Sequence, residues 1–175
     1  KPKNMGEKIN CKGFDSEPAL TADGRGLYYS SSRAGGKGGK DIWYVAYNGE
    51  KQWGKPLNLG REINTSGHEV TPYIHPDNKY LYFASDNRDG LGGYDVFYAA
   101  RKDSIQFENA VNLGYPVNTE KDEGSFIVNL DYTKAYIDVY DYQGRFSTCF
   151  IYNFKLPEAL AGKHKSTYAK GFVYD

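Results

Sequence analysis

Several residue types and patterns that often identify a protein class are scarce or missing in this chain. Its 175 residues include two cysteines and one methionine, and 22 basic side chains balance 22 acidic ones. Two cysteines are too few for a disulfide scaffold, and a net charge of zero gives no global field that favours nucleic acid or an anionic membrane surface. No apolar run approaches the ~20 residues needed to span a bilayer, and no signal peptide is visible.

The usual patterns of catalytic and metal-binding residues are missing as well. The three histidines do not have the spacing of metal ligands; they are His68, His75 and His164. The serines at 30–32 have no G-x-S-x-G pattern around them, and no sialidase-type S-x-D-x-G-x-T-W box is present. Asp122 and Glu123 are adjacent, so in a strand they point to opposite faces and cannot flank one bond. We therefore expect no catalysis.

A repeat with a spacing of 54 residues is the strongest pattern that is present. Residues 27–31 (LYYSS) return as 81–85 (LYFAS), and residues 38–42 (GGKDI) return as 92–96 (GGYDV). A third copy follows at the same offset, in which Tyr98 maps to Tyr152 and Cys149 falls on the position of the repeated Asp. Self-similarity at this period is typical of stacked supersecondary units that cannot bury their apolar faces alone.

The repeat divides the chain into units. We predict the end of a preceding blade at 1–10, blades at 11–66 and 67–119, and a divergent last blade at 120–156. Residues 157–175 are predicted to be a linker, with a short helical turn at 157–161, followed by the start of a β-sandwich domain at 170–175. Cys11 and Cys149 lie at non-equivalent repeat positions, and we expect both to be unpaired.

The second unit has the clearest strand pattern. Short β-rich stretches at 70–74 and 80–84 flank a Pro-Asp-Asn turn, in which His75 is expected to be solvated. A third strand is predicted at 95–100, after a glycine loop, and a weaker fourth strand around 107–113. Four antiparallel strands in each repeat, with Gly and Tyr abundant, predict an all-β fold: a partial β-propeller of four-stranded blades.

These motifs closely resemble the PD40 family of WD40-like propeller repeats related to those of TolB. The resemblance is carried by the Asp-Gly-type turns, the LYFAS-type strand and the Gly-Gly-x-Asp-Ile/Val strand start. The segments at 35–43 and 112–119 are similar to the version found in multidomain envelope proteins of Bacteroidetes. In those proteins the propeller stands between tetratricopeptide repeats and a regulatory-like β-sandwich, followed by an OmpA-like peptidoglycan-binding domain.

The resemblance implies a location and a set of partners. It implies a periplasmic, outer-membrane-associated protein that binds other envelope or secretion-system proteins and is held to peptidoglycan by a domain outside this chain. One member of this architecture belongs to the type IX secretion apparatus. No cofactor, nucleic acid or direct membrane insertion is implied.

Strand counting places a candidate partner-binding surface at one end of the blades. The loop between the second and third strands lies at the same end as the segment entering the next blade, and loops often carry binding residues. The partner-binding candidates at this end are Arg33, His68, Glu69, Asp86, Arg88, Asp89 and Glu123. Residues that recur with the repeat are expected to be structural instead: Asp23, Gly24, Asp41, Gly60, Asp77, Asp95 and Gly114.

The sequence also suggests two other kinds of site. The oxygen-rich segment 86–90 suits calcium in composition, but its spacing is not D-x-D-x-D-G and Arg88 places a positive charge in its middle, so no metal site is predicted. Exposed aromatics such as Trp43, Trp53 and Tyr94 could stack on sugars. The sequence therefore predicts a non-catalytic interaction scaffold, with a glycan- or peptide-binding propeller as the alternative and an enzyme-associated propeller as the third possibility.

Overall fold

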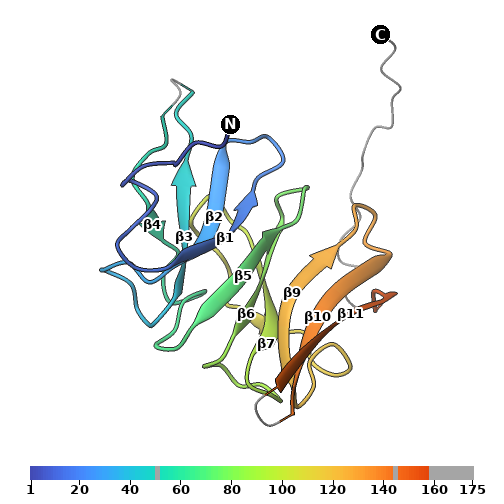
Figure 1. Ribbon diagram of the computed structural model, residues 1–175. Coiled ribbons are helices and arrows are strands. Elements are labelled where there is room, and N and C mark those ends of the chain that lie inside the picture. Colours follow the sequence, from blue (N-terminus) through green and yellow to red (C-terminus); the bar gives the residue numbers. More distant parts are fainter. Residues whose placement is uncertain (50–51, 144–145, 158–175) are drawn as a thin grey trace.

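The computed structural model describes residues 1–49, 52–143 and 146–157. Three antiparallel sheets lie side by side, and no helix occurs among the described residues (Figure 1). The described residues therefore contain no helix that is long and apolar enough to cross a membrane. The expected helical turn at 157–161 and the strand at 170–175 fall outside the described residues.

The first two sheets have the same four-stranded construction. In both sheets each strand lies beside the strand that follows it in the sequence. The fourth strand of each sheet is only two residues long. The first sheet contains β1 (Asp15–Leu20), β2 (Gly26–Ser31), β3 (Asp41–Ala46) and β4 (Leu57–Asn58). The second contains β5 (Glu69–Ile74), β6 (Tyr80–Ser85), β7 (Asp95–Ala100) and β8 (Val111–Asn112).

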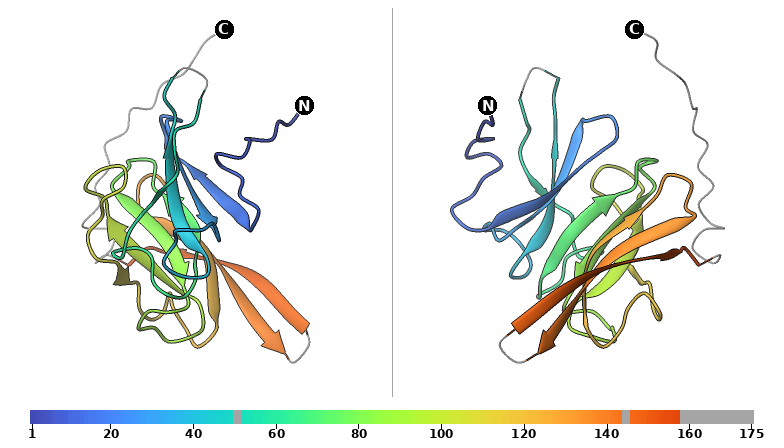
Figure 2. Two further views of the ribbon diagram at one scale, coloured as in Figure 1. Left: turned by 90° about the vertical axis from the view of Figure 1, so that its left-hand side faces the viewer. Right: turned by 45° about the vertical axis from the view of Figure 1, so that its right-hand side comes forward.

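The third sheet departs from this construction. It has three strands among the described residues: β9 (Asp122–Val128), β10 (Lys134–Gln143) and β11 (Phe146–Lys155). The last two form a hairpin of ten-residue strands that projects beyond the other sheets (Figure 2). The described residues between 120 and 157 therefore contain three of the four strands expected in each unit, and the chain extends the hairpin where the other units have a glycine loop.

The long hairpin also moves the repeat register by one residue. Phe83 pairs with Phe97 in the second sheet, but the equivalent Ile137 pairs with Tyr152. The assignment of Tyr152 to the position of Tyr98 is therefore wrong. Ser85 pairs with Asp95, whereas the corresponding Val139 pairs with Phe150, so Cys149 does not occupy the aspartate position either.

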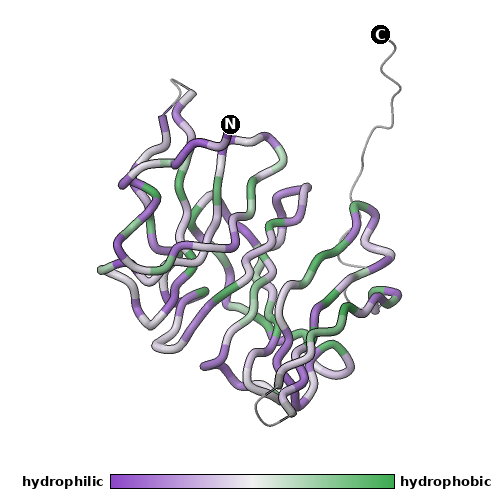
Figure 3. Tube along the Cα trace, viewed as in Figure 1, coloured by the Kyte–Doolittle hydropathy of each residue, from purple (hydrophilic) through white to green (hydrophobic). Residues whose placement is uncertain are grey.

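Apolar side chains fill the spaces between neighbouring sheets. Figure 3 shows hydrophobic residues along the strands and mainly hydrophilic residues in the loops. Ile63 belongs to the cluster that joins Tyr28 and Ile42 of the first sheet to Phe83 of the second. Val117 belongs to the next cluster, between the second and third sheets. Each sheet thus buries at least one face against a neighbour or a connecting segment, as stacked repeats require.

The same tight turn occurs before each sheet, at 6–10, 60–64 and 114–118. In each copy two consecutive amides donate to the carbonyl of the leading glycine. The asparagine that ends the second copy, Asn64, uses its side chain to bond both the N–H and the C=O of Ile42, and Asn118 does the same at Val96. These side chains hold the connecting segments against β3 and β7.

His75 is fully buried, which corrects the expectation of a solvated turn residue. Its ring stacks on Tyr132 with 4.0 Å between ring centroids, and Nδ1 lies 2.9 Å from a carboxylate oxygen of Asp77. The Tyr132 hydroxyl donates to the other oxygen of Asp77. The turn of the second sheet is buried because the third sheet packs over it, and a single repeat gives no sign of that contact.

Candidate functional site

The glycine loops and the segments entering the next sheet do share one end of the molecule. Ser31 and Asp41 pair at the end of β2 and β3, and Ser31 also lies opposite Asp15 at the start of β1. The loop after β2 reaches the second sheet, where Glu69 donates its N–H to the Lys40 carbonyl. The loop after β6 reaches the third sheet in the same way, with the Glu123 N–H bonded to the Tyr94 carbonyl.

The repeated aspartates at this end fold the glycine loops. Asp41 accepts hydrogen bonds from the N–H groups of Lys37 and Gly38. Asp95 accepts from the N–H groups of Leu91 and Gly92. Both carboxylates are buried, and each satisfies loop amides that would otherwise lack acceptors.

The remaining repeated positions lie in tight turns. Asp23 accepts from the Arg25 N–H and the Thr21 hydroxyl, and Asp77 accepts from the Lys79 N–H. The glycines of this group have positive φ, which glycine adopts without a steric penalty: Gly24, Gly60 and Gly114.

Glu69 and Glu123 are fully buried carboxylates. Each accepts hydrogen bonds from the N–H and the hydroxyl of a threonine four residues earlier, Thr65 or Thr119. Burial raises the pKa of both groups, although the positive charge of Arg88 opposes the rise at Glu69. Asp15 holds the equivalent position in the first sheet.

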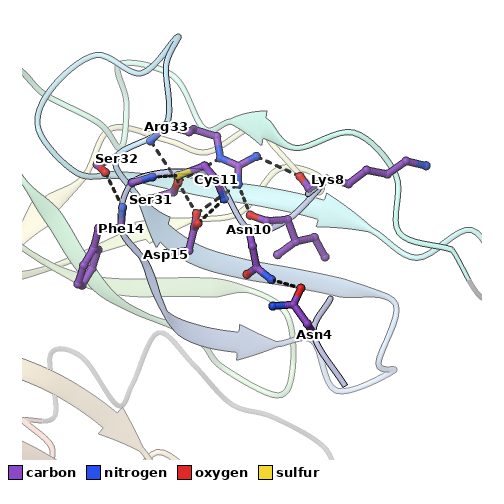
Figure 4. A network of polar contacts seen from close by, with 11 residues as sticks. Asn4, Lys8, Asn10, Cys11, Phe14, Asp15, Ser31, Ser32 and Arg33 are labelled. Carbon is purple, nitrogen blue, oxygen red and sulfur yellow. Dashed lines mark hydrogen bonds and ion pairs between the residues drawn. The ribbon is translucent and has the colours of Figure 1, made fainter. Parts of the chain in front are cut away.

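Arg33 and Arg88 bind equivalent backbone atoms from positions that differ by one residue in the repeat. Arg33 donates to the carbonyls of Lys8 and Ile9, and Arg88 donates to those of Glu62 and Ile63, 54 residues later. Figure 4 shows the Arg33 guanidinium between residues 8–10 and Asp15, with which it forms an ion pair. Both arginines are thus engaged within the chain.

Aromatic rings complete the two arginine sites. The Arg33 guanidinium lies 5.3 Å from the ring centroids of both Tyr29 and Trp43. That of Arg88 lies 5.8 Å from Phe83 and 5.6 Å from Phe97, the equivalent pair.

The other candidate residues differ in their exposure and in their hydrogen bonds. Asp86 is exposed, and its carboxylate accepts the backbone N–H of His68 at 2.6 Å. Nδ1 of His68 is buried and has no partner among the described residues. Asp89 is exposed, and its carbonyl accepts a bond from the Asn112 amide. The structure brings His68 and Asp86 together, but Arg33 contacts the first sheet and Glu123 belongs to the third.

A hollow of about 200 Å³ at this end is built by all three sheets. We call it the three-sheet hollow. Its polar and aromatic lining comprises Glu17, Lys40, Thr71, Tyr94, Asp122, Glu123, Tyr140 and Tyr142. Tyr142 is 61% exposed at the rim. Sequence reasoning named Tyr94 and Glu123 from this lining but missed Tyr140 and Tyr142, because these two lie in the third unit, where the repeated glycine loop is lost.

Strained backbone borders the three-sheet hollow. Glu17 and Thr71 occupy the same bulge in β1 and β5, with φ of 56° and 50°, and the Glu17 carboxylate accepts the Thr71 N–H at 2.7 Å. A β-branched residue with positive φ is a steric outlier. Such strain often accompanies functional positions.

The tyrosines of the three-sheet hollow are neutral hydrogen-bonding groups at ordinary pH. Burial, with the nearby carboxylates Asp86 and Asp122, raises the pKa of Tyr94 to about 12. Burial and Asp138 raise the pKa of Tyr140 to about 12. Both hydroxyls therefore suit contact with a polar partner better than proton abstraction.

No group of three or more His, Cys, Asp or Glu side chains in the described ranges could hold a metal ion. Both cysteines are free, Cys11 half-buried and Cys149 exposed.

Comparisons with known proteins identify the architecture. No protein-family model and no curated protein matches the chain. Among solved structures, it is similar to TolB from Acinetobacter baumannii, with 13% identity and a TM-score of 0.54 over 83% of this chain and 31% of that one. It is also similar to a TolB described as putative from Agrobacterium tumefaciens, with 14% identity and a TM-score of 0.59 over 86% and 47%.

A third similar structure is an enzyme. It is the α-L-arabinofuranosidase of Podospora anserina in complex with cellotriose, with 14% identity and a TM-score of 0.51 over 88% of this chain and 49% of that one. The chain spans between a third and a half of these proteins. Together with the antiparallel sheets, the three likenesses establish an all-β fold, a partial β-propeller, and at these identities they establish the fold alone.

Proposed function

We propose that this chain is a non-catalytic β-propeller segment that acts as a protein-interaction scaffold. The observation that carries the proposal is the three-sheet hollow, where tyrosines from two sheets meet the carboxylates of Glu17 and Asp122. Tyrosine supplies large contact area and a polar tip, and it is enriched at protein interfaces. The repeated polar residues nearby brace the loops, so the partner would meet a preorganised surface.

We further propose that the protein works in the periplasm, associated with the outer membrane and linked to peptidoglycan, and that it serves type IX secretion. The support is the resemblance of segments 35–43 and 112–119 to Bacteroidetes envelope proteins, together with the likeness to TolB. Cell fractionation tests the location. The protein should sediment with outer membrane and peptidoglycan, and recovery in the cytosol would contradict this part.

The interaction is tested by following the native complex in envelope extracts. Tyr142→Ala removes a ring from the rim of the three-sheet hollow and should shift the protein from a high-mass complex to its monomer position on a native gel. Tyr136→Ala is the matched control, because Tyr136 is an exposed tyrosine of the same strand that does not line the hollow. A complex that survives Tyr142→Ala unchanged, or no complex at all, would overturn the proposal.

A glycan- or peptide-binding propeller is the second candidate. The cellotriose-bound arabinofuranosidase with a similar fold and the tyrosines of the hollow favour it. Of the three aromatics suggested for stacking, Tyr94 lines the hollow, whereas Trp43 is buried and Trp53 packs beside it. Titration with muropeptides and cello-oligosaccharides should move the Tyr94 resonances under this candidate and leave them unchanged under the first. An enzyme-associated propeller is the third candidate, which an activity screen on the same sugars would reveal.

A further inference from the structure

The first two sheets each enclose one guanidinium in an arginine cradle. We use this name for two backbone carbonyls of the connecting turn and two cross-strand rings of the sheet. In the first sheet the carbonyls belong to Lys8 and Ile9, and Arg33 fills the cradle. In the second they belong to Glu62 and Ile63, and Arg88 fills it with bonds of 3.0 and 2.9 Å.

The third sheet has an equivalent cradle in which none of the described arginines lies. Pro116 and Val117 stand 54 residues after Glu62 and Ile63, and the turn around them has the same hydrogen bonds. Ile137 and Tyr152 pair across β10 and β11 as Phe83 and Phe97 pair across β6 and β7. The glycine loop that supplies Arg33 and Arg88 is replaced by the long hairpin, and no described residue of that hairpin fills this place with a guanidinium.

A hollow of about 500 Å³ occupies the position of the missing side chain, and we call it the vacant cradle. Its lining includes Pro116, Val117, Ile137 and Tyr152. Among the described residues, no donor bonds the carbonyl oxygen of Pro116 or Val117. The hollow therefore offers the acceptors that two arginines use elsewhere, with one aromatic ring in place of two.

The carboxylate at the equivalent repeat position of the third sheet, Glu123, also lacks the usual partners. Asp15 is paired with Arg33 and accepts from the Ser31 hydroxyl, and Glu69 accepts from Ser85 and feels the charge of Arg88. Glu123 lies opposite Val139, which has no hydroxyl, and the described donors to its carboxylate are the N–H and the hydroxyl of Thr119. A buried carboxylate with no cation nearby is costly, and a guanidinium in the cradle would offset that cost.

The charges at the rim do not oppose a cation. Glu120, Lys121 and Lys155 line the opening, and Lys121 is held 2.6 Å from the Asp141 carboxylate. With Asp141 included, these four side chains have no net charge. Selectivity for one kind of cation over another must then come from the geometry of the cradle.

We propose that the vacant cradle receives an arginine side chain from a protein partner, as a third guanidinium site of this chain. The proposal rests on the proposed function, because it names the chemistry by which a scaffold partner is held. A planar guanidinium can bond two adjacent carbonyls while stacking on the Tyr152 ring, which an ammonium cannot do as well.

Three short probes test the proposal on the full chain. They are blocked Ala-Arg-Ala, Ala-Lys-Ala and Ala-citrulline-Ala peptides, titrated while amide and methyl NMR signals are followed. The arginine peptide should shift signals at 114–121, Ile137 and Tyr152. The citrulline peptide has the same shape without charge and should bind about tenfold more weakly, because charge-assisted hydrogen bonds are roughly twice as strong as neutral ones.

A matched pair of variants locates the site. Tyr152→Ala removes the stacking ring and should weaken the arginine peptide about twofold to fivefold, the effect of one exposed cation–π contact. Ile151→Ala is the control, since Ile151 is the next residue, is 80% exposed and points to the opposite face of β11. If Tyr152→Ala disturbs the fold, the comparison of arginine with citrulline on the unmodified chain still decides the question.

Equal binding of the three peptides, or shifts scattered away from the vacant cradle, would overturn the proposal. If the probes fail while the Tyr142-dependent complex persists, this inference falls and the proposed function stands. A complex that survives Tyr142→Ala unchanged, with selective arginine binding retained, would instead reject the three-sheet hollow as the partner site.

Discussion

The guanidinium of Arg88 donates to the carbonyls of Glu62 and Ile63 and lies against Phe83 and Phe97. Arg88→Met keeps most of the side-chain length but leaves both carbonyls without this donor. We expect a loss of about 2–3 kcal/mol in the free energy of unfolding, because an unsatisfied buried acceptor costs about 1–3 kcal/mol. Urea denaturation measures the change.

The control for this variant is Arg61→Met. Arg61 is largely exposed and forms an ion pair with the adjacent Glu62, at 3.2 Å, so its replacement should cost less than about 0.5 kcal/mol. If the two variants unfold at the same urea concentration, Arg88 does not stabilise the interface between the first two sheets.

The buried carboxylate of Glu123 makes stability depend on pH. Burial raises its pKa above the usual 4.5, so the unfolded chain ionises first as pH rises. Its contribution is favourable below the unfolded pKa and is lost as pH rises through the folded pKa. Glu123→Gln should therefore raise the melting temperature by a few degrees at pH 7 and leave it unchanged near pH 3.

Glu69 provides the comparison for this pH effect. It is buried in the same position, but Arg88 partly compensates its charge. Glu69→Gln should stabilise the chain less at pH 7, or destabilise it, because Arg88 then loses a nearby negative charge. Melting curves of both variants between pH 3 and pH 8 test this, and equal gains would show that Arg88 does not influence Glu69.

At the scale of elements, the glycine loops connect neighbouring sheets through close backbone contacts. A Cβ on Gly92 would lie 1.9 Å from the Lys121 carbonyl oxygen. Gly92→Ala should push the loop away from the third sheet and weaken the bond from the Glu123 N–H to the Tyr94 carbonyl. Hydrogen exchange at the Glu123 amide should become faster.

The equivalent link between the first two sheets is an internal control. The Glu69 N–H bonds the Lys40 carbonyl at 2.8 Å, and its exchange rate should not change in Gly92→Ala. Leu91→Ala alters an exposed neighbour in the same loop and should leave both amides protected. Slower or unchanged exchange at Glu123 in Gly92→Ala would contradict the contact.

The sequence predicts the elements well where the repeat is intact and poorly where it changes. Strands expected at 70–74, 80–84 and 95–100 agree with β5, β6 and β7 to within a residue. In the third sheet the constant offset hid a one-residue shift, because the long hairpin replaces the glycine loop whose length keeps the register in the first two sheets. The burial of His75 depends on packing from the next sheet, which no local pattern contains.

Site prediction was limited for a related reason. Arg33 and Arg88 looked functional because they do not align in the repeat, yet their long side chains reach equivalent carbonyls from neighbouring positions. Conversely, Tyr94, Tyr140 and Tyr142 converge from two sheets. Such convergence depends on the three-dimensional arrangement, so the sequence could indicate that the loops share one end but not that Tyr140 and Tyr142 meet Tyr94 there.

At the scale of the whole molecule, three sheets combine to form a surface that none of them has alone. The first contributes Glu17 and Lys40, the second Tyr94, and the third Asp122, Tyr140 and Tyr142. The vacant cradle lies separately, between the turn at 114–118 and the outer strands of the third sheet. The protein recognition that we propose would therefore use composite surfaces of the assembled sheets.

In-cell photo-crosslinking tests this central claim most directly. A photoreactive residue replaces Tyr142 at the three-sheet hollow, or Tyr136 as a control that is also exposed but lines neither that hollow nor the vacant cradle, and adducts are identified by mass. We predict one discrete protein adduct at 142 that is absent at 136 and that decreases when Tyr94→Ala is added. The same adducts at both positions, or none at 142, would contradict the claim that the assembled sheets form a protein-binding surface.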